Sequence, residues 1–164
     1  MKHNRESRSL ILLTILMAVL LSLIPLPEVL SPFKPYWVAL VMIYWSLETN
    51  DMINMGLAFL VGLVLDILSG SLMGLHALSL VVMVFLVQHF RSRLRFFPPW
   101  QQALSVLGLL VNDRIILIWI AALLGEPLPT WQYWLPPLIG MALWPWLFLL
   151  LDRYRGVMRH RSTL

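Results

Sequence analysis

The chain has 164 residues, enough for one domain; 60% of them are hydrophobic, only 12% are charged and the formal net charge is +4. A soluble domain carries about 25% charged residues, so this composition predicts an integral membrane protein with little room for a soluble domain. The absence of cysteine from the sequence excludes disulfides, zinc sites with thiolate ligands and cysteine nucleophiles.

Six apolar segments follow one another along the chain, and each is typical of a membrane helix. A helix needs about 20 residues to span a bilayer, with about 17 as a practical minimum. We expect six transmembrane helices, at about residues 9–24, 35–47, 52–68, 72–90, 102–124 and 134–151. The second segment is the shortest, and it spans comfortably only if it continues to Asn50. Residues 1–164 are therefore predicted to form a single all-α, multi-pass membrane domain.

Basic residues are distributed very unevenly over the predicted loops. Of the twelve Lys and Arg residues, ten would lie on one side of a six-helix arrangement and only Lys34 on the other, while Arg114 lies inside the fifth segment. The ten are Lys2, Arg5, Arg8, Arg91, Arg93, Arg95, Arg153, Arg155, Arg159 and Arg161. The positive-inside rule then predicts that both termini are cytoplasmic. Topology thus explains the net positive charge without a nucleic-acid partner, and the basic loop and tail are suited to anionic membrane lipids.

Four polar residues at membrane depth form a candidate intramembrane cluster: Asp66, His76, Asp113 and Arg114. Counted along their helices, Asp66 lies about 21 Å and Arg114 about 18 Å from the cytoplasmic end, within a hydrocarbon core of about 30 Å. A lone charge at such depth costs about 2.5 kcal/mol or more. We therefore expect Asp66 to pair with Arg114, with Asp113 as a further partner. The cluster is either a functional site or switch, or a structural knot that orients helices.

Small residues surround Asp66 where the third segment meets the fourth. Gly62 lies one turn before Asp66 on the same helix face and would allow close packing of two helices in lipid. Ser69, Gly70 and Gly74 follow, and we interpret these glycines first as turn formers. The stretch predicts one helix end, a very tight turn and the start of the next helix.

Two further residues, His76 and Pro145, are of types that often have a specific role. No second histidine lies near His76 in the sequence, so neither a metal site nor a cofactor is expected. Ser69 and Ser71 near His76 could suggest a serine hydrolase, but no nucleophile motif supports one. Pro145 lies inside the sixth segment, where it should kink the helix.

Together these residues resemble the MreD family of rod shape-determining proteins. The resemblance extends from the first predicted helix to the last, and Arg114 departs from it because an apolar residue is expected there. It rests on four stretches: Gly62-x-x-x-Asp66-Ile-Leu-Ser-Gly70-Ser-x-x-Gly74, Pro35-x-Trp37-Val-x-Leu-Val-x-Ile-Tyr-Trp45, Trp100-Gln-Gln-Ala-Leu104 and Leu143-Trp-Pro-Trp146.

The resemblance implies a non-enzymatic component of the bacterial cell-elongation complex, located in the inner membrane. Its implied direct partner is MreC, and the complex also contains MreB filaments, a SEDS glycosyltransferase and a penicillin-binding transpeptidase. The family is similar in architecture to the six-helix substrate-binding subunits of energy-coupling-factor transporters. The alternative function is therefore a small-molecule, vitamin-like binding subunit of a transporter, which would use the polar interior around Asp66 as its pocket.

Overall fold

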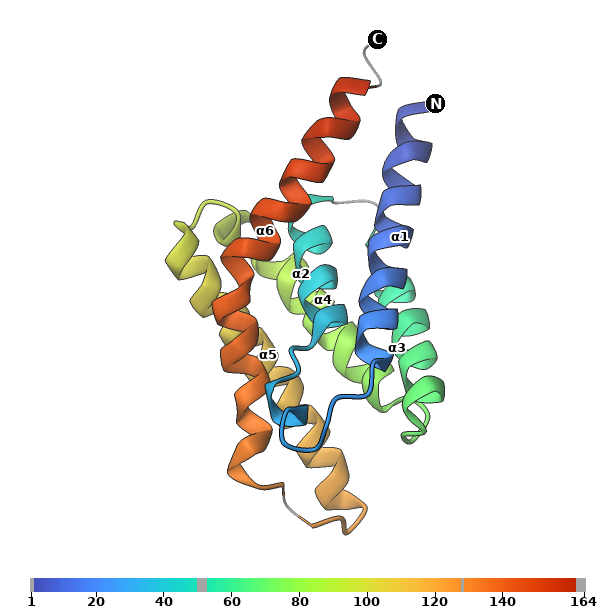
Figure 1. Cartoon of the computed structure of the whole chain (residues 1–164), viewed down its shortest axis with the longest axis vertical. Coiled ribbons are helices and arrows are strands. Elements are labelled where there is room, and N and C mark those ends of the chain that lie inside the picture. The colour runs from blue at the N-terminus through green and yellow to red at the C-terminus, as the bar shows by residue number, and fades with distance from the viewer. Residues whose placement is uncertain (1, 50–52, 128, 162–164) are drawn as a thin grey trace.

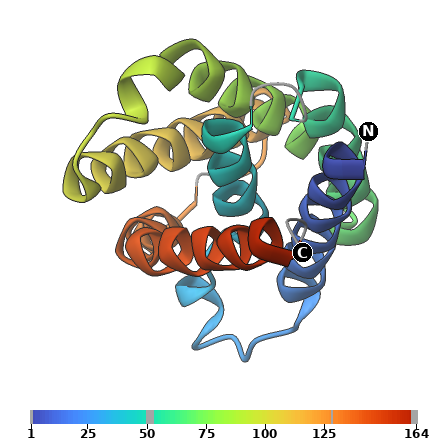
Figure 2. The ribbon, with the colours of Figure 1, turned by 90° about the horizontal axis from the view of Figure 1, so that it is seen from above.

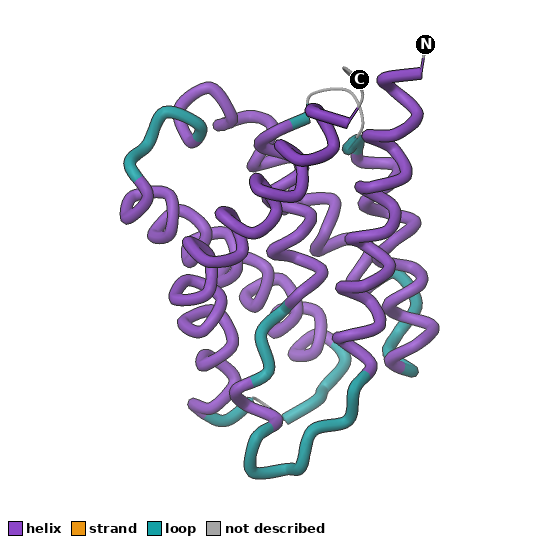
Figure 3. The backbone as a smooth tube through the Cα atoms, turned by 45° about the horizontal axis from the view of Figure 1, so that its top comes forward, coloured by secondary structure: helices purple, strands orange, loops and turns teal. Residues whose placement is uncertain are grey.

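The computed structural model describes residues 2–49, 53–127 and 129–161 of the chain. Within these residues it is all-helical, with six α-helices and two short 3₁₀ helices and no strands, as predicted (Figure 3). The helices are α1 (Lys2–Leu23), η1 (Ser31–Phe33), α2 (Trp37–Glu48), α3 (Met55–Ser69), α4 (Leu75–Leu94), α5 (Pro99–Leu123), η2 (Trp131–Trp134) and α6 (Leu135–Arg161).

Three stretches are long and apolar enough to cross a membrane: Leu75–Leu94, Pro99–Leu123 and Trp131–Gly156. Two more apolar stretches are shorter, Arg8–Leu23 and Met55–Ser69. The prediction of a membrane protein is therefore supported by composition and length of the helices.

Helix α2 lies at the centre of the bundle, with the other helices around it (Figure 2). It has 12 residues, and every one from Val38 to Leu47 is buried. At 1.5 Å per residue it is about 18 Å long, too short to cross a hydrocarbon core alone. A helix that is apolar on all sides is typical of a buried position, and α2 occupies one. The Trp45 indole N–H donates to the Thr14 hydroxyl of α1 at 2.9 Å, which fixes the two helices together.

The helix bounds differ from the apolar segments mainly at the charged ends. Helix α1 begins at Lys2 rather than near residue 9, and α6 continues to Arg161 rather than ending near residue 151. An apolar run shows only which part of a helix can lie in lipid. Charged residues such as Arg are also good helix formers, so the helix continues beyond the apolar run. Helix α3 begins later than the apolar run because Asn54 caps it, its side chain accepting the Leu57 N–H at 2.8 Å.

Different parts of the chain lie at the two ends of the bundle (Figure 1). Both chain termini lie at one end, which we call the termini end. There Glu48, at the end of α2, pairs with Arg155 of α6 and lies 3.9 Å from Arg95 beyond α4. The α3–α4 turn, η1 and η2 lie at the opposite end, which we call the turn end.

Helix α6 contains Pro145, as the sequence indicated. Proline has no N–H to donate to the carbonyl of Met141, one turn earlier, so the helix ladder is interrupted there. Figure 1 shows α6 changing direction part-way along its length. The neighbouring Trp144 is buried, and its indole N–H donates to Gln102 of α5 at 3.1 Å.

Candidate functional site: the α3–α4 turn and the adjoining pocket

The chain reverses direction between α3 and α4 through two glycines with left-handed backbone. Gly70 caps the C-terminus of α3 with φ +63°, and Gly74 precedes α4 with φ +99°. The Ser71 N–H returns to the Asp66 carbonyl at 3.1 Å, which closes the last turn of α3. Only glycine adopts these angles without strain, which explains why the turn needs both residues.

The Asp66 side chain caps the N-terminus of the neighbouring helix α4. Its carboxylate accepts the backbone N–H groups of Gly74 at 2.8 Å, His76 at 2.9 Å and Ala77 at 3.4 Å. The first residues of a helix have N–H groups without intrahelical partners, and Gly74 has no side chain that could serve them. The negative carboxylate also lies where the helix dipole favours it. Asp66 is thus an N-cap supplied from another helix.

Two side chains complete the environment of the Asp66 carboxylate. The Ser71 hydroxyl donates to it at 3.0 Å, and the His76 ring nitrogen Nδ1 lies 2.8 Å from the same oxygen. Because a carboxylate only accepts, Nδ1 carries the proton in this contact. Asp66 is buried and its two oxygens are fully engaged by five donors.

Gly62 permits the close approach that makes this capping possible. A Cβ atom built at Gly62 would lie 2.2 Å from the Ala77 Cα and 2.9 Å from the His76 carbonyl carbon. Both neighbours are backbone atoms of α4, so they cannot move aside as a flexible side chain would. The first turns of α4 therefore lie directly against α3 at this level, and any larger residue would separate the helices.

Arg114 does not pair with Asp66, so the predicted ion pair is wrong. Among the described residues the ion-pair partner of Asp66 is His76, and the Arg114 guanidinium lies over the Tyr133 ring at 4.6 Å and near the Tyr36 ring at 5.9 Å. The prediction matched charges by depth and overlooked the backbone N–H groups of α4, which satisfy Asp66 without a cation. Cation–π contacts on two tyrosines take the place of the expected pair.

Asp113 is buried between α4 and α5. The Ser79 hydroxyl of α4 donates to one of its oxygens, and the other oxygen has no hydrogen-bond partner among the described residues. The four residues of the predicted cluster therefore make three separate sets of direct contacts: Asp66 with His76, Asp113 with Ser79, and Arg114 with two tyrosines. Asp113 is still close enough to Arg114 and His76 to interact with them electrostatically. Ser79 was not singled out from the sequence, although it lies three residues after His76 and so shares its helix face.

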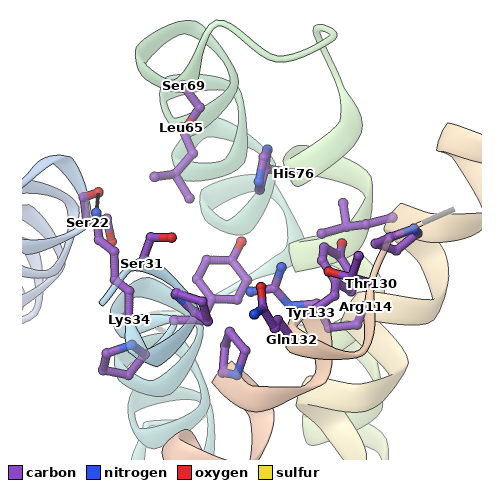
Figure 4. A pocket seen from close by; sticks show the side chains of 16 residues that line it. Ser22, Ser31, Lys34, Leu65, Ser69, His76, Arg114, Thr130, Gln132 and Tyr133 are labelled. Carbon is purple, nitrogen blue, oxygen red and sulfur yellow. Dashed lines mark hydrogen bonds between the residues drawn. The ribbon is translucent and has the colours of Figure 1, made fainter. Parts of the chain in front are cut away.

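A pocket of about 500 Å³ opens at the turn end beside this cluster. Arg114, His76 and Lys34 line it, together with the exposed Ser69 that the sequence placed near the turn (Figure 4). Lys34 and Tyr36 come from the segment before α2, and Tyr133 comes from η2. Neither tyrosine was singled out from the sequence as a site residue, because nothing in their spacing indicates that they meet Arg114.

The sequence of the chain was compared with models of known protein families. The model of the family described as rod shape-determining protein MreD matches residues 4–154. The chain belongs to the MreD family. The rod shape-determining protein MreD of Haemophilus influenzae is 33% identical over 138 residues, which cover 84% of this chain and 85% of that protein. No solved structure matches the chain.

Membership of the MreD family confirms the resemblance inferred from the motifs and supports a rod-shape-determining role. MreD proteins are shape-determining structural proteins rather than a known enzyme family, so the buried carboxylates are not assigned to catalysis. The match includes the α3–α4 turn, the pocket and all of α2 to α5. The geometry around Asp66 is thus a property of the MreD-like part of the chain.

Proposed function

We propose that this MreD-family chain is a non-enzymatic scaffold of the cell-elongation complex in the bacterial inner membrane. In this proposal it binds MreC directly. It thereby helps to couple MreB filaments to peptidoglycan synthesis by a SEDS glycosyltransferase and a penicillin-binding transpeptidase. The family match over residues 4–154 is the observation that carries the proposal.

Two features of the molecule support a scaffold. Helices account for most of the described chain, so partners must be met through helix faces and short loops. Large apolar side chains are exposed along α1 and α3, including Leu12 and Leu16 at 57% each, Leu60 at 60% and Ile67 at 64%. Such faces contact either lipid or the helices of partner proteins in a membrane.

The proposal includes an orientation, with both termini in the cytoplasm. The termini lie at the same end of the bundle, together with Arg95 and Arg155. We expect cytoplasmic reporters to be active when fused after Leu47, Phe97 or Leu164, and periplasmic reporters to be active when fused after Leu30, Ser71 or Pro129. Cytoplasmic activity of the Pro129 fusion would contradict six spans with this orientation.

The partner assignment is tested by deletion and by purification. Deletion of the gene is expected to give rounded cells, and the tagged protein in mild detergent is expected to copurify MreC. The matched control carries the same tag on an unrelated six-helix membrane protein and should not retain MreC. The scaffold proposal would be contradicted if the deletion cells stayed rod-shaped and the unrelated control protein retained as much MreC as the tagged protein does.

The second candidate is a binding subunit of a small-molecule transporter, with the fold of energy-coupling-factor substrate-binding subunits. The pocket of about 500 Å³ at the turn end favours it, because it offers polar side chains in a concave site. Deletion cells that keep their rod shape but fail to take up a vitamin would favour this candidate over the scaffold.

A further inference from the structure

The turn-end pocket is cationic and contains no acidic side chain among its described lining residues. Lys34 and Arg114 line it from different elements, and Figure 4 shows them on opposite sides with His76 above. Two carboxylates lie near the pocket, and Asp113 is close enough to Arg114 to interact with it electrostatically, but neither forms an ion pair with Arg114 or Lys34 among the described residues. Asp66 is engaged by five donors of the α3–α4 turn, and Asp113 accepts from Ser79.

Arg114 is held in a way that leaves its hydrogen-bonding edge available. The central carbon of its guanidinium lies over the Tyr133 ring at 4.6 Å and over the Tyr36 ring at 5.9 Å from the ring centroids. No carboxylate of the described residues lies within ion-pair distance of it. A guanidinium carries five N–H donors in a planar fork, which binds oxyanions in a bidentate manner, and a cation–π contact does not replace such a partner.

Two further donors belong to residues that line the same pocket. The Tyr36 hydroxyl is buried and has no hydrogen-bond partner among the described residues, although Tyr36 lines the pocket. A buried hydroxyl without a partner requires explanation. A ligand in the pocket accepts its hydrogen once the Tyr36 side chain turns to expose the hydroxyl. Lys34 donates to the Ser22 and Ile24 carbonyls at the end of α1, which fixes its ammonium group at the wall of the pocket.

We propose that this pocket binds a phosphate group, with Arg114 as its anchor and Tyr36 and Lys34 as secondary contacts. A tetrahedral phosphate has enough acceptor oxygens for the guanidinium, the phenol and the ammonium together, whereas a carboxylate has only two. The phosphate belongs either to a lipid headgroup, since the pocket lies at an end of the apolar helices, or to a small soluble phosphate compound. This ligand is separate from the protein partners of the proposed scaffold.

The test uses the full-length protein, purified and delipidated in a neutral detergent. Binding of inorganic phosphate, pyrophosphate and a short-chain phosphatidylglycerol is measured by isothermal titration calorimetry, with acetate as the carboxylate probe. We expect at least one phosphate ligand to bind, and Arg114→Leu to weaken it at least about tenfold, which is about 1.4 kcal/mol. The affinity of Arg114→Lys should lie between those of the unchanged protein and Arg114→Leu, because lysine keeps the charge but loses the bidentate geometry.

The matched control is Arg93→Leu, which removes the same charge from an exposed site beyond the pocket. It should change the affinity by less than about twofold, because an exposed and distant charge is screened by salt. Tyr36→Phe keeps the aromatic ring beside Arg114 but removes the hydroxyl donor, so it should weaken phosphate binding. If Arg114→Leu does not fold, then Arg114→Lys and Tyr36→Phe decide the result.

The outcomes separate the possible ligand sources. Binding of phosphatidylglycerol without binding of free phosphate or pyrophosphate would identify a lipid headgroup, and the reverse would identify a soluble ligand. Equal binding of acetate, an equal loss with Arg93→Leu, or no binding of any phosphate compound would overturn the proposal.

Discussion

Asp66→Ala is expected to destabilise the protein by at least about 3 kcal/mol. The substitution leaves the N–H groups of Gly74, His76 and Ala77 at the partly buried start of α4 without their acceptor. Each buried donor left unpaired costs about 1–3 kcal/mol, and partial entry of water reduces the total. On the scale of soluble domains of this size, about 2–4 °C per kcal/mol, the melting temperature should fall by about 6–12 °C. Thermal unfolding of the purified protein in detergent measures the change.

The amide variant provides a sharper test of the same contact. In Asp66→Asn one carboxylate oxygen becomes an NH₂ group, which must face either the Gly74 or the His76 backbone N–H. Two donors then oppose each other, so we expect a substantial loss of stability despite the nearly identical shape. Asp152→Ala is the control, because Asp152 is about half exposed and its pair with Arg155 is worth about 0.3–0.5 kcal/mol. A melting temperature of Asp66→Ala equal to that of the control would contradict the capping role.

The sequence was sufficient to locate the α3–α4 turn but not to identify its chemistry. Gly70 and Gly74 lie between two apolar runs, where glycine most often forms a turn, so the turn could be predicted. The donors that satisfy Asp66 are mostly backbone N–H groups, and every residue except proline carries one. No side-chain pattern therefore reveals that a helix start, rather than Arg114, is the partner of the carboxylate.

Contacts between distant segments explain the other differences. Glu48 and Arg155 are 107 positions apart, and Ser79 and Asp113 are 34 apart, so only the packing of helices brings them together. The apolar segments of a single sequence indicate six helices, but they do not show which helix faces meet. The central position of α2 was partly foreseeable, since a short helix that is apolar on all sides is suited to burial.

Gly62→Ala is expected to be nearly as damaging as Asp66→Ala, although it adds only one methyl group. The new Cβ would lie 2.2 Å from the Ala77 Cα and 2.5 Å from its nitrogen, which forces α3 and α4 apart. Atoms in ordinary contact lie about 3.5–4.0 Å apart, so the required shift exceeds about 1 Å. A shift of this size also lengthens the hydrogen bonds from α4 to Asp66 beyond useful range. Melting temperature and recovery of MreC from detergent extracts measure the consequences.

Gly108→Ala in α5 is the matched control, because a Cβ at Gly108 meets no atom within 4 Å. Replacing a helical glycine by alanine without a clash stabilises a helix by about 0.5–1 kcal/mol, so the two substitutions should have opposite signs. The double variant Gly62→Ala with Asp66→Ala should be less destabilised than the sum of the single variants, because both disrupt the same contact between α3 and α4. Strict additivity, or a stabilising effect of Gly62→Ala, would mean that close approach of the helices and capping by Asp66 are not coupled.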